Sequence, residues 1–188
     1  LKNIAIPSSV REIGEYAFYR CSSLVSASII GNAKTTIGNY IFQNSASLIS
    51  ATIGNGVTST GMATFAGCSS LTSVTFGNSV TTIGGGAFSF CESLTNIEIS
   101  ESNKTFAVID NILYDKKEKM LHTCFSKKTN VVIPNGILKI NNNAFSYCKS
   151  LTSITIPNSV TTIGNGAFSG CGSLTSITIP NSVTTIGD

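Results

Sequence analysis

The chain has 188 residues and a formal net charge of +3, and 11% of its side chains are charged, against about 25% in ordinary globular domains. Charges so few and so scattered argue against nucleic-acid binding, and no apolar run reaches the length that direct membrane insertion needs. Threonine, serine, asparagine and glycine supply most of the polarity instead.

A repeat of about 23 residues organises the chain. The segment LTSITIPNSVTTIG occurs twice without change, at 151–164 and 174–187. Including weaker copies, units begin at Leu1, Leu24, Leu48, Leu71, Leu94, Lys128, Leu151 and Leu174. A fixed period of this size is typical of a solenoid, so we expect one solenoid domain over residues 1–188. Because the first residues lie in a predicted strand and Asp188 falls within a repeat, we interpret the chain as a fragment of a longer protein.

Each unit predicts the same short elements in order. The opening L-x-x-I-x-I alternates apolar and polar residues, which indicates a strand with one buried face. Proline follows that strand in four units and ends it, because proline lacks an N–H donor; the second unit has the longer turn 30–34 in this place. V-x-x-I then predicts a second short strand and glycine a corner. The Ala-Phe pair after it predicts one turn of α- or 3₁₀-helix.

Stacking the units superimposes equivalent side chains. We therefore expect a single spine of buried rings, each contributing roughly 1.5–3 kcal/mol. The spine consists of Phe18, Phe42, Phe65, Phe88, Phe145 and Phe168.

An insertion at about residues 100–127 lengthens the fifth unit. Residues 94–128 hold 5 of the 9 acidic and 6 of the 12 basic side chains of the chain. Residues 107–114 and 119–125 read as strands joined by the polar turn 115–118, which predicts a hairpin projecting from the solenoid. Its candidate binding residues are Tyr114, Lys116, Lys117, Lys119 and His122. A recognition element and a charged loop that shields the stack are equally open interpretations.

The full pattern L-x-x-I-x-I-P-x-S-V-x-x-I-G-x-x-A-F-x-x-C resembles the BspA-type, or Treponema-type, leucine-rich repeat. The insertion is similar to a longer unit of that family, I-D-x-x-L-Y-x-K-x-x-x-x-L, at residues 109–116 with Leu121. The third unit departs from the pattern at Gly56 and Thr60. The resemblance implies a right-handed, curved leucine-rich repeat solenoid, mainly β, on secreted or surface proteins of host-associated bacteria and some protists. It implies adhesion to host proteins or other cells, and it carries no catalytic residues.

The cysteines recur at the repeat period. Cys21, Cys68, Cys91, Cys148 and Cys171 share one position, where the second unit has Ser45, and Cys124 is out of register. Secretion would favour disulfides, but stacked Cβ atoms about 4.8 Å apart exceed the 3.5–4.5 Å that a disulfide needs. We expect free, buried thiols. Since His122 is the only histidine, neither a zinc site nor a Cys–His nucleophile follows from the spacing. The sequence argues against an enzyme and implies no cofactor.

The outward residues of the first strands form the other candidate surface. They are Ser26, Ser28, Ser50, Thr52, Ser73, Thr75, Asn96, Glu98, Ser153, Thr155, Ser176 and Thr178. The face lacks the aromatic and arginine anchors of most hot spots, so a ligand would be held weakly through hydroxyl groups and strengthened by repetition. The alternative is that serine and threonine are simply soluble strand residues.

Two functions remain open from the sequence. The first is a non-enzymatic adhesion scaffold of a secreted or cell-surface protein, with a protein or glycan ligand on host or other cells. The second is a spacer that presents another domain. Rows of threonine also suggest ice or crystal binding, which a curved sheet disfavours. The segment Asn103-Lys104-Thr105 is a glycosylation sequon, which matters only in a eukaryotic source.

Overall fold

The computed structural model describes residues 1–125 and 127–188, which divide into two compact units, Leu1–Val108 and Ile109–Asp188. Each unit is a β-solenoid with a repeat of about 23 residues, and no helix occurs in the described residues. The solenoid prediction is confirmed for each unit. That both form a single domain stays a prediction.

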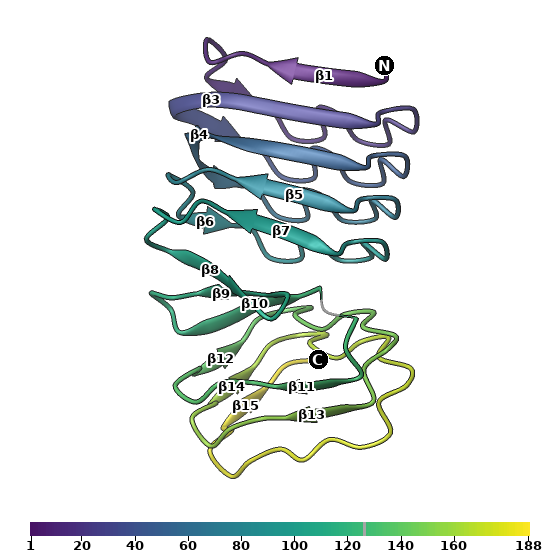
Figure 1. Ribbon diagram of the computed structural model, residues 1–188, viewed down its shortest axis with the longest axis vertical. Coiled ribbons are helices and arrows are strands. Elements are labelled where there is room, and N and C mark those ends of the chain that lie inside the picture. Colours follow the sequence, from purple (N-terminus) through teal and green to yellow (C-terminus); the bar gives the residue numbers. More distant parts are fainter. Residues whose placement is uncertain (126) are drawn as a thin grey trace. The chain divides into compact units, whose positions relative to one another are not determined.

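Unit 1 stacks its first strands as a parallel sheet. The strands are β1 (Asn3–Ile6), β3 (Ser26–Ile37), β4 (Ser50–Thr60), β5 (Ser73–Phe76) and β7 (Asn96–Ile99), in that order (Figure 1). A second ladder is formed by β2 (Glu12–Ile13), the ends of β3 and β4, and β6 (Thr82–Ile83). β8 (Phe106–Ile109) contains the boundary between the units. Both strands predicted for each repeat are therefore present in this unit.

The corner between the two ladders takes two forms in unit 1. Pro7 follows β1 directly, and a tight turn links β1 to β2. Where proline is absent, the predicted turn 30–34 is wrong, because β3 continues through the corner with shifts of register against β4. The backbones approach closely at Gly31 and Gly56, where an added Cβ would collide with the facing strand. A residue other than proline keeps its N–H donor, which allows the ladder to follow the chain around this bend. It does not require it, since β5 ends at a turn that begins with Gly77 rather than proline.

The predicted helical turn after each glycine is also wrong. These segments are successive tight turns in which two residues per repeat have positive φ, such as Tyr16 (φ 58°) and Arg20 (φ 52°). Left-handed residues interrupt a right-handed helix after less than one turn. The backbone hydrogen bonds of these segments run both between repeats and within the turn: the Phe18 N–H donates to the Ile41 carbonyl at 2.8 Å, and the Tyr19 N–H donates to the Tyr16 carbonyl at 3.0 Å.

The phenylalanine stack is present within each unit. In unit 1, the rings of Phe18, Phe42, Phe65 and Phe88 follow one another with centroids 5.5, 5.6 and 5.8 Å apart. In unit 2, the rings of Phe145 and Phe168 stack at 5.3 Å. The rings of Phe42, Phe65 and Phe145 are fully buried. The spine prediction is confirmed for each unit taken by itself.

Unit 2 contains two further parallel ladders. The first strands β11 (Asn130–Val132) and β13 (Ser153–Thr155) pair with each other. The second ladder runs through β10 (Met120–Cys124), β12 (Lys139–Ile140), β14 (Thr162–Ile163) and β15 (Thr185–Ile186). β9 (Ile112–Asp115) is antiparallel to β10. The insertion therefore adds strands to the second ladder of this unit.

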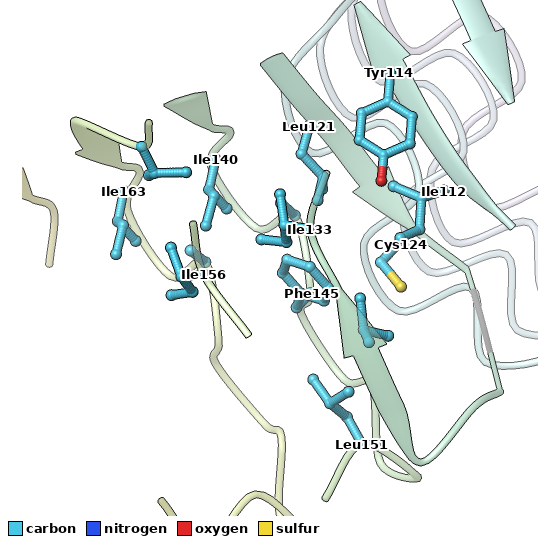
Figure 2. Packing of buried hydrophobic residues seen from close by; sticks show 14 residues of the cluster. Ile112, Tyr114, Leu121, Cys124, Ile133, Ile140, Phe145, Leu151, Ile156 and Ile163 are labelled. Carbon is cyan, nitrogen blue, oxygen red and sulfur yellow. The ribbon is translucent and has the colours of Figure 1, made fainter. Parts of the chain in front are cut away.

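The prediction of a projecting hairpin is wrong. Leu121 pairs with Ile140 in parallel register and is fully buried. Figure 2 shows Leu121 and Cys124 of the hairpin beside Ile133 and Phe145 in one apolar cluster. The predicted strand 107–114 is also divided, because Asp110 and Asn111 both have positive φ and form a turn between β8 and β9. Apolar side chains on both hairpin strands can be buried only if the hairpin lies in the sheet, so packing determines its position.

Candidate functional site

The outward face of the parallel strands in unit 1 is the largest regular surface among the predicted sites. Strand register aligns its residues in two rows across neighbouring repeats. One row is Asn3, Ser26, Ser50, Ser73 and Asn96, and the other is Ala5, Ser28, Thr52, Thr75 and Glu98. The structure thus brings together eight of the residues that the sequence proposed, on one face of five strands (Figure 1).

Several polar side chains of this face already bind one another. The Ser26 hydroxyl donates to Asn3 Oδ1 at 2.8 Å. The Thr75 hydroxyl donates to Glu98 Oε2 at 3.3 Å, and the Asn96 amide donates to Glu98 Oε1 at 3.0 Å. Some polar groups of the face therefore already bind neighbouring repeats. Glu98 is held in one orientation by two of these hydrogen bonds.

An open depression lies beside the middle of β4 and the ends of β5 and β7. Its volume is about 500 Å³, and its lining includes Thr52, Thr75, Glu98 and Glu101 together with parts of Phe76. Thr52 and both glutamates are exposed to solvent. Three predicted residues thus share one concave site, whose polar side chains are hydroxyls, carboxylates and the amide of Asn55. Glu101 was not among the predicted binding residues, because it follows the strand and no repeat position marks it.

The equivalent face of unit 2 is smaller. Its two strands align Asn130 with Ser153 and Val132 with Thr155. The Ser153 hydroxyl donates to Asn130 Oδ1 at 3.0 Å, as Ser26 does to Asn3 in unit 1. The remaining predicted residues, Ser176 and Thr178, are exposed but lie outside any assigned strand.

The structure divides the predicted hairpin residues into two groups. The side chains of Tyr114 and His122 are only 5% and 4% exposed, so a partner at the surface does not reach them. Burial raises the pKa of Tyr114 to about 12. Lys116, Lys117 and Lys119 are exposed in the turn, which Asp115 stabilises by accepting the backbone N–H groups of residues 117 and 118. Only the lysines remain accessible.

Asn103, the glycosylation candidate, is buried in unit 1. Its amide nitrogen donates to the carbonyl oxygens of Gly77 and Val80 at 3.2 and 2.9 Å, and its oxygen accepts the N–H groups of Thr105 and Phe106. The side chain is 2% exposed. Asn103 therefore holds the chain where it leaves the regular repeat, and its amide is not available for glycosylation in this fold.

All six cysteines are free thiols; Cys68, Cys91 and Cys124 are buried as predicted, whereas Cys21, Cys148 and Cys171 are only half-buried. In unit 1, Cys68 and Cys91 donate to the carbonyl oxygens of Phe42 and Phe65, each at 3.1 Å. Ser45 makes the equivalent bond to the Phe18 carbonyl at 2.9 Å, which explains why it can replace cysteine. Burial raises the pKa of the Cys68 thiol to about 12 and that of Cys91 well above its usual value. Their position in the stack identifies them as donors to the neighbouring repeat.

The thiols of unit 2 follow the same pattern. Cys171 donates to the Phe145 carbonyl at 3.1 Å, and Cys148 to the Cys124 carbonyl at 3.7 Å. A side-chain hydrogen bond with the Cys124 thiol and burial both raise the pKa of Cys148, and burial raises that of Cys171. A thiol held protonated is a poor nucleophile, so these groups are unsuited to catalysis.

Within residues 1–125 and 127–188, no group of three or more histidine, cysteine or acidic side chains could hold a metal ion. The same residues contain no helix that is long and apolar enough to cross a membrane.

The parallel ladders, the buried phenylalanine stack and the 23-residue period define a leucine-rich repeat protein. A sequence profile described as a BspA type leucine rich repeat region matches residues 1–119 and 117–188. The chain belongs to this family, as the repeat pattern predicted. The family is typically non-enzymatic, and its fold is typical of surface and adhesion-like proteins. No curated protein matches the chain.

Solved structures of bacterial proteins share the fold. A leucine-rich repeat protein from Eubacterium ventriosum has a TM-score of 0.85 and 28% identity over 100% of this chain and 56% of its own. The pneumococcal vaccine antigen PcpA has a TM-score of 0.67 and 19% identity, covering 97% of this chain and 51% of its own. A leucine-rich cell surface protein from Faecalibacterium prausnitzii has a TM-score of 0.56 and 26% identity over 100% of this chain and 69% of its own. The chain spans about half the length of the first two.

Proposed function

We propose that the chain is a non-enzymatic binding module of a secreted or cell-surface protein, and that it acts in adhesion to a protein on a host or another cell. The observation that carries this proposal is the outward strand face of unit 1, where five strands are aligned and an open depression lies beside three of them, β4, β5 and β7. A concave or flat sheet presented by a repeat stack is a common interaction surface. The description of a similar structure as a cell surface protein supports the location.

The proposal assigns binding to the strand face rather than to the hairpin. The hairpin contributes Leu121 and Cys124 to the core and offers a partner only its turn lysines. The strand face instead presents rows of serine and threonine side chains beside Glu98. Hydroxyl contacts repeated along the stack give modest affinity per site and gain strength from several simultaneous contacts.

The test is a binding screen of the 188-residue chain against immobilised extracellular-matrix proteins and glycans. Thr52→Tyr places a ring on the strand face, and Thr82→Tyr places the same ring on β6 of the second ladder as a control, since both threonines are exposed. We expect binding to a matrix protein that Thr52→Tyr abolishes and Thr82→Tyr preserves, with both variants melting within about 2 °C of the parent. Equal binding by both variants would exclude the strand face.

The spacer remains the second candidate because two units share an unbroken 14-residue identity, at 151–164 and 174–187. Interchangeable units allow the length of a stack to change without a change of fold. Absence of any ligand for the chain, together with unchanged folding after removal of residues 151–173, would favour the spacer over the adhesion module.

A further inference from the structure

The lining of this depression, beside the middle of β4 and the ends of β5 and β7, has an excess of negative charge. Glu98 and Glu101 contribute two carboxylates, and no other lining side chain that the structure describes is charged. Ile99, which is half-buried, supplies an apolar surface beside them, whereas Ile53 and Phe76 are buried. An acidic recess with an apolar side is complementary to a group that has both a positive charge and an aliphatic stem.

Glu98 is oriented before any ligand arrives. One neutral donor holds each carboxylate oxygen: the Thr75 hydroxyl binds Oε2 at 3.3 Å, and the Asn96 amide binds Oε1 at 3.0 Å. A carboxylate oxygen accepts about two hydrogen bonds, so each oxygen retains capacity for one more. Two parallel acceptors on a fixed carboxylate match the planar fork of a guanidinium group.

We propose that this depression receives an arginine side chain of the protein partner, with its guanidinium on Glu98 and its stem against Ile99. The inference rests on the strand-face binding proposed above and specifies the chemistry of the partner. A divalent cation is a poorer match, because it takes six or more oxygen ligands and the described residues offer no group of three potential ligands. A lysine ammonium cannot use both oxygens of Glu98 in the same planar geometry.

The probes are acetyl-Gly-Arg-Gly-amide and the same peptide with citrulline, which keeps the shape of arginine and removes its charge. Each is titrated into the 188-residue chain while backbone amide signals are followed by NMR. We expect the arginine peptide to shift the signals of Gly54, Gly77 and Ser100, which line the depression. Citrulline should bind about tenfold more weakly, because hydrogen bonds to charged groups are about twice as strong as neutral ones. Equal shifts from both peptides would overturn the proposal.

Two variants locate the site. Glu98→Gln keeps the size and the acceptor of the side chain and removes the charge, so we expect about a tenfold loss of arginine-peptide affinity. Glu12→Gln removes an exposed carboxylate from the second ladder of the same unit and should change nothing. Equal effects of the two variants, or shifts spread over the whole chain, would reduce the interaction to general charge attraction and refute the site.

The same variants separate this inference from the adhesion proposal. If a matrix protein binds the chain and Thr52→Tyr abolishes binding while Glu98→Gln does not, the strand face is the binding surface and the arginine site is wrong. If the arginine peptide binds at Glu98 while no macromolecule binds the chain, the recess chemistry is correct and the adhesion proposal fails. A lysine peptide that binds as tightly as the arginine peptide would refute the bidentate geometry.

Discussion

Unit 1 and unit 2 follow one repeat but fill their spines differently. In unit 1 each of the first four repeats places a phenylalanine in the stack, and the Phe42 N–H donates to the Thr64 carbonyl at 3.0 Å. In unit 2, Cys124 makes the corresponding bond to the Ala144 carbonyl at 2.7 Å, directly before Phe145. Cys124 therefore takes the backbone position of a spine phenylalanine. The comparison shows that backbone hydrogen bonds define the repeat and that the side chain at the position can change.

The largest loss of stability should come from removing one phenylalanine ring from the unit 1 stack. Phe65 is fully buried between Phe42 and Phe88, so Phe65→Ala should lower the free energy of unfolding by about 3–5 kcal/mol. Phe168 in unit 2 is only partly buried, so Phe168→Ala should lower it by clearly less. Urea denaturation followed by circular dichroism measures both. Equal losses would show that the two stacks are equally tight and would remove the contrast between the units.

The next effect tests whether the hairpin belongs to the core of unit 2. Leu121→Ala removes a fully buried side chain that packs in the cluster of Figure 2, and we expect a loss of about 2–5 kcal/mol by the same measurement. Lys117→Ala in the exposed turn of the same hairpin should stay within about 0.5 kcal/mol of the parent. If both changes were neutral, the hairpin would be a dispensable loop.

Asn103 tests how unit 1 accommodates the irregular segment. Asn103→Ala leaves the carbonyls of Gly77 and Val80 without this donor, inside the protein. An unsatisfied buried group costs about 1–3 kcal/mol, so the melting temperature should fall by several degrees. Ser102→Ala alters an exposed neighbour and should leave it unchanged. Efficient glycosylation of Asn103 in a eukaryotic secretory host, with the fold retained, would contradict its burial.

The regular part of the fold was predictable because side-chain pattern and packing agree there. Period-2 alternation predicted β1, β5 and β7, and the recurrence of phenylalanine predicted the stack. The strand-face rows followed from the same register. The depression was not predictable, because Glu101 comes to line it only through the path of the chain after β7.

The missed features have a common physical origin. Tyr16 and Arg20 are not residues that usually adopt positive φ. The signal lies in other repeats, where glycine occupies the equivalent positions, as Gly86 does for Tyr16 and Gly67 for Arg20. The insertion is rich in charged side chains, which suggested an exposed loop. Only a few apolar residues, such as Leu121 and Cys124, connect it to the core of unit 2. Leu121 pairs with Ile140, which is 19 rather than 23 residues later in the chain. A search for the 23-residue period therefore could not place the hairpin in the sheet.

The smallest effect concerns the thiol donors of unit 1. Because Ser45 already makes the bond that Cys68 makes one repeat later, Cys68→Ser should keep the donor to Phe42 and lower stability by only about 1 kcal/mol.

The pH dependence of the same thiol has a definite sign. The pKa of Cys68 is raised from 9.0 to about 12, so below pH 9 both folded and unfolded chains hold the proton and its stabilising contribution is complete. Between pH 9 and about 12 the unfolded chain ionises first, and stability falls. Cys68→Ser lacks this ionisation, so the stability difference between parent and variant should shrink as the pH rises from 8 to 10. A difference that stays constant over this range would show that Cys68 is accessible to solvent and that the repeats of unit 1 open at this position.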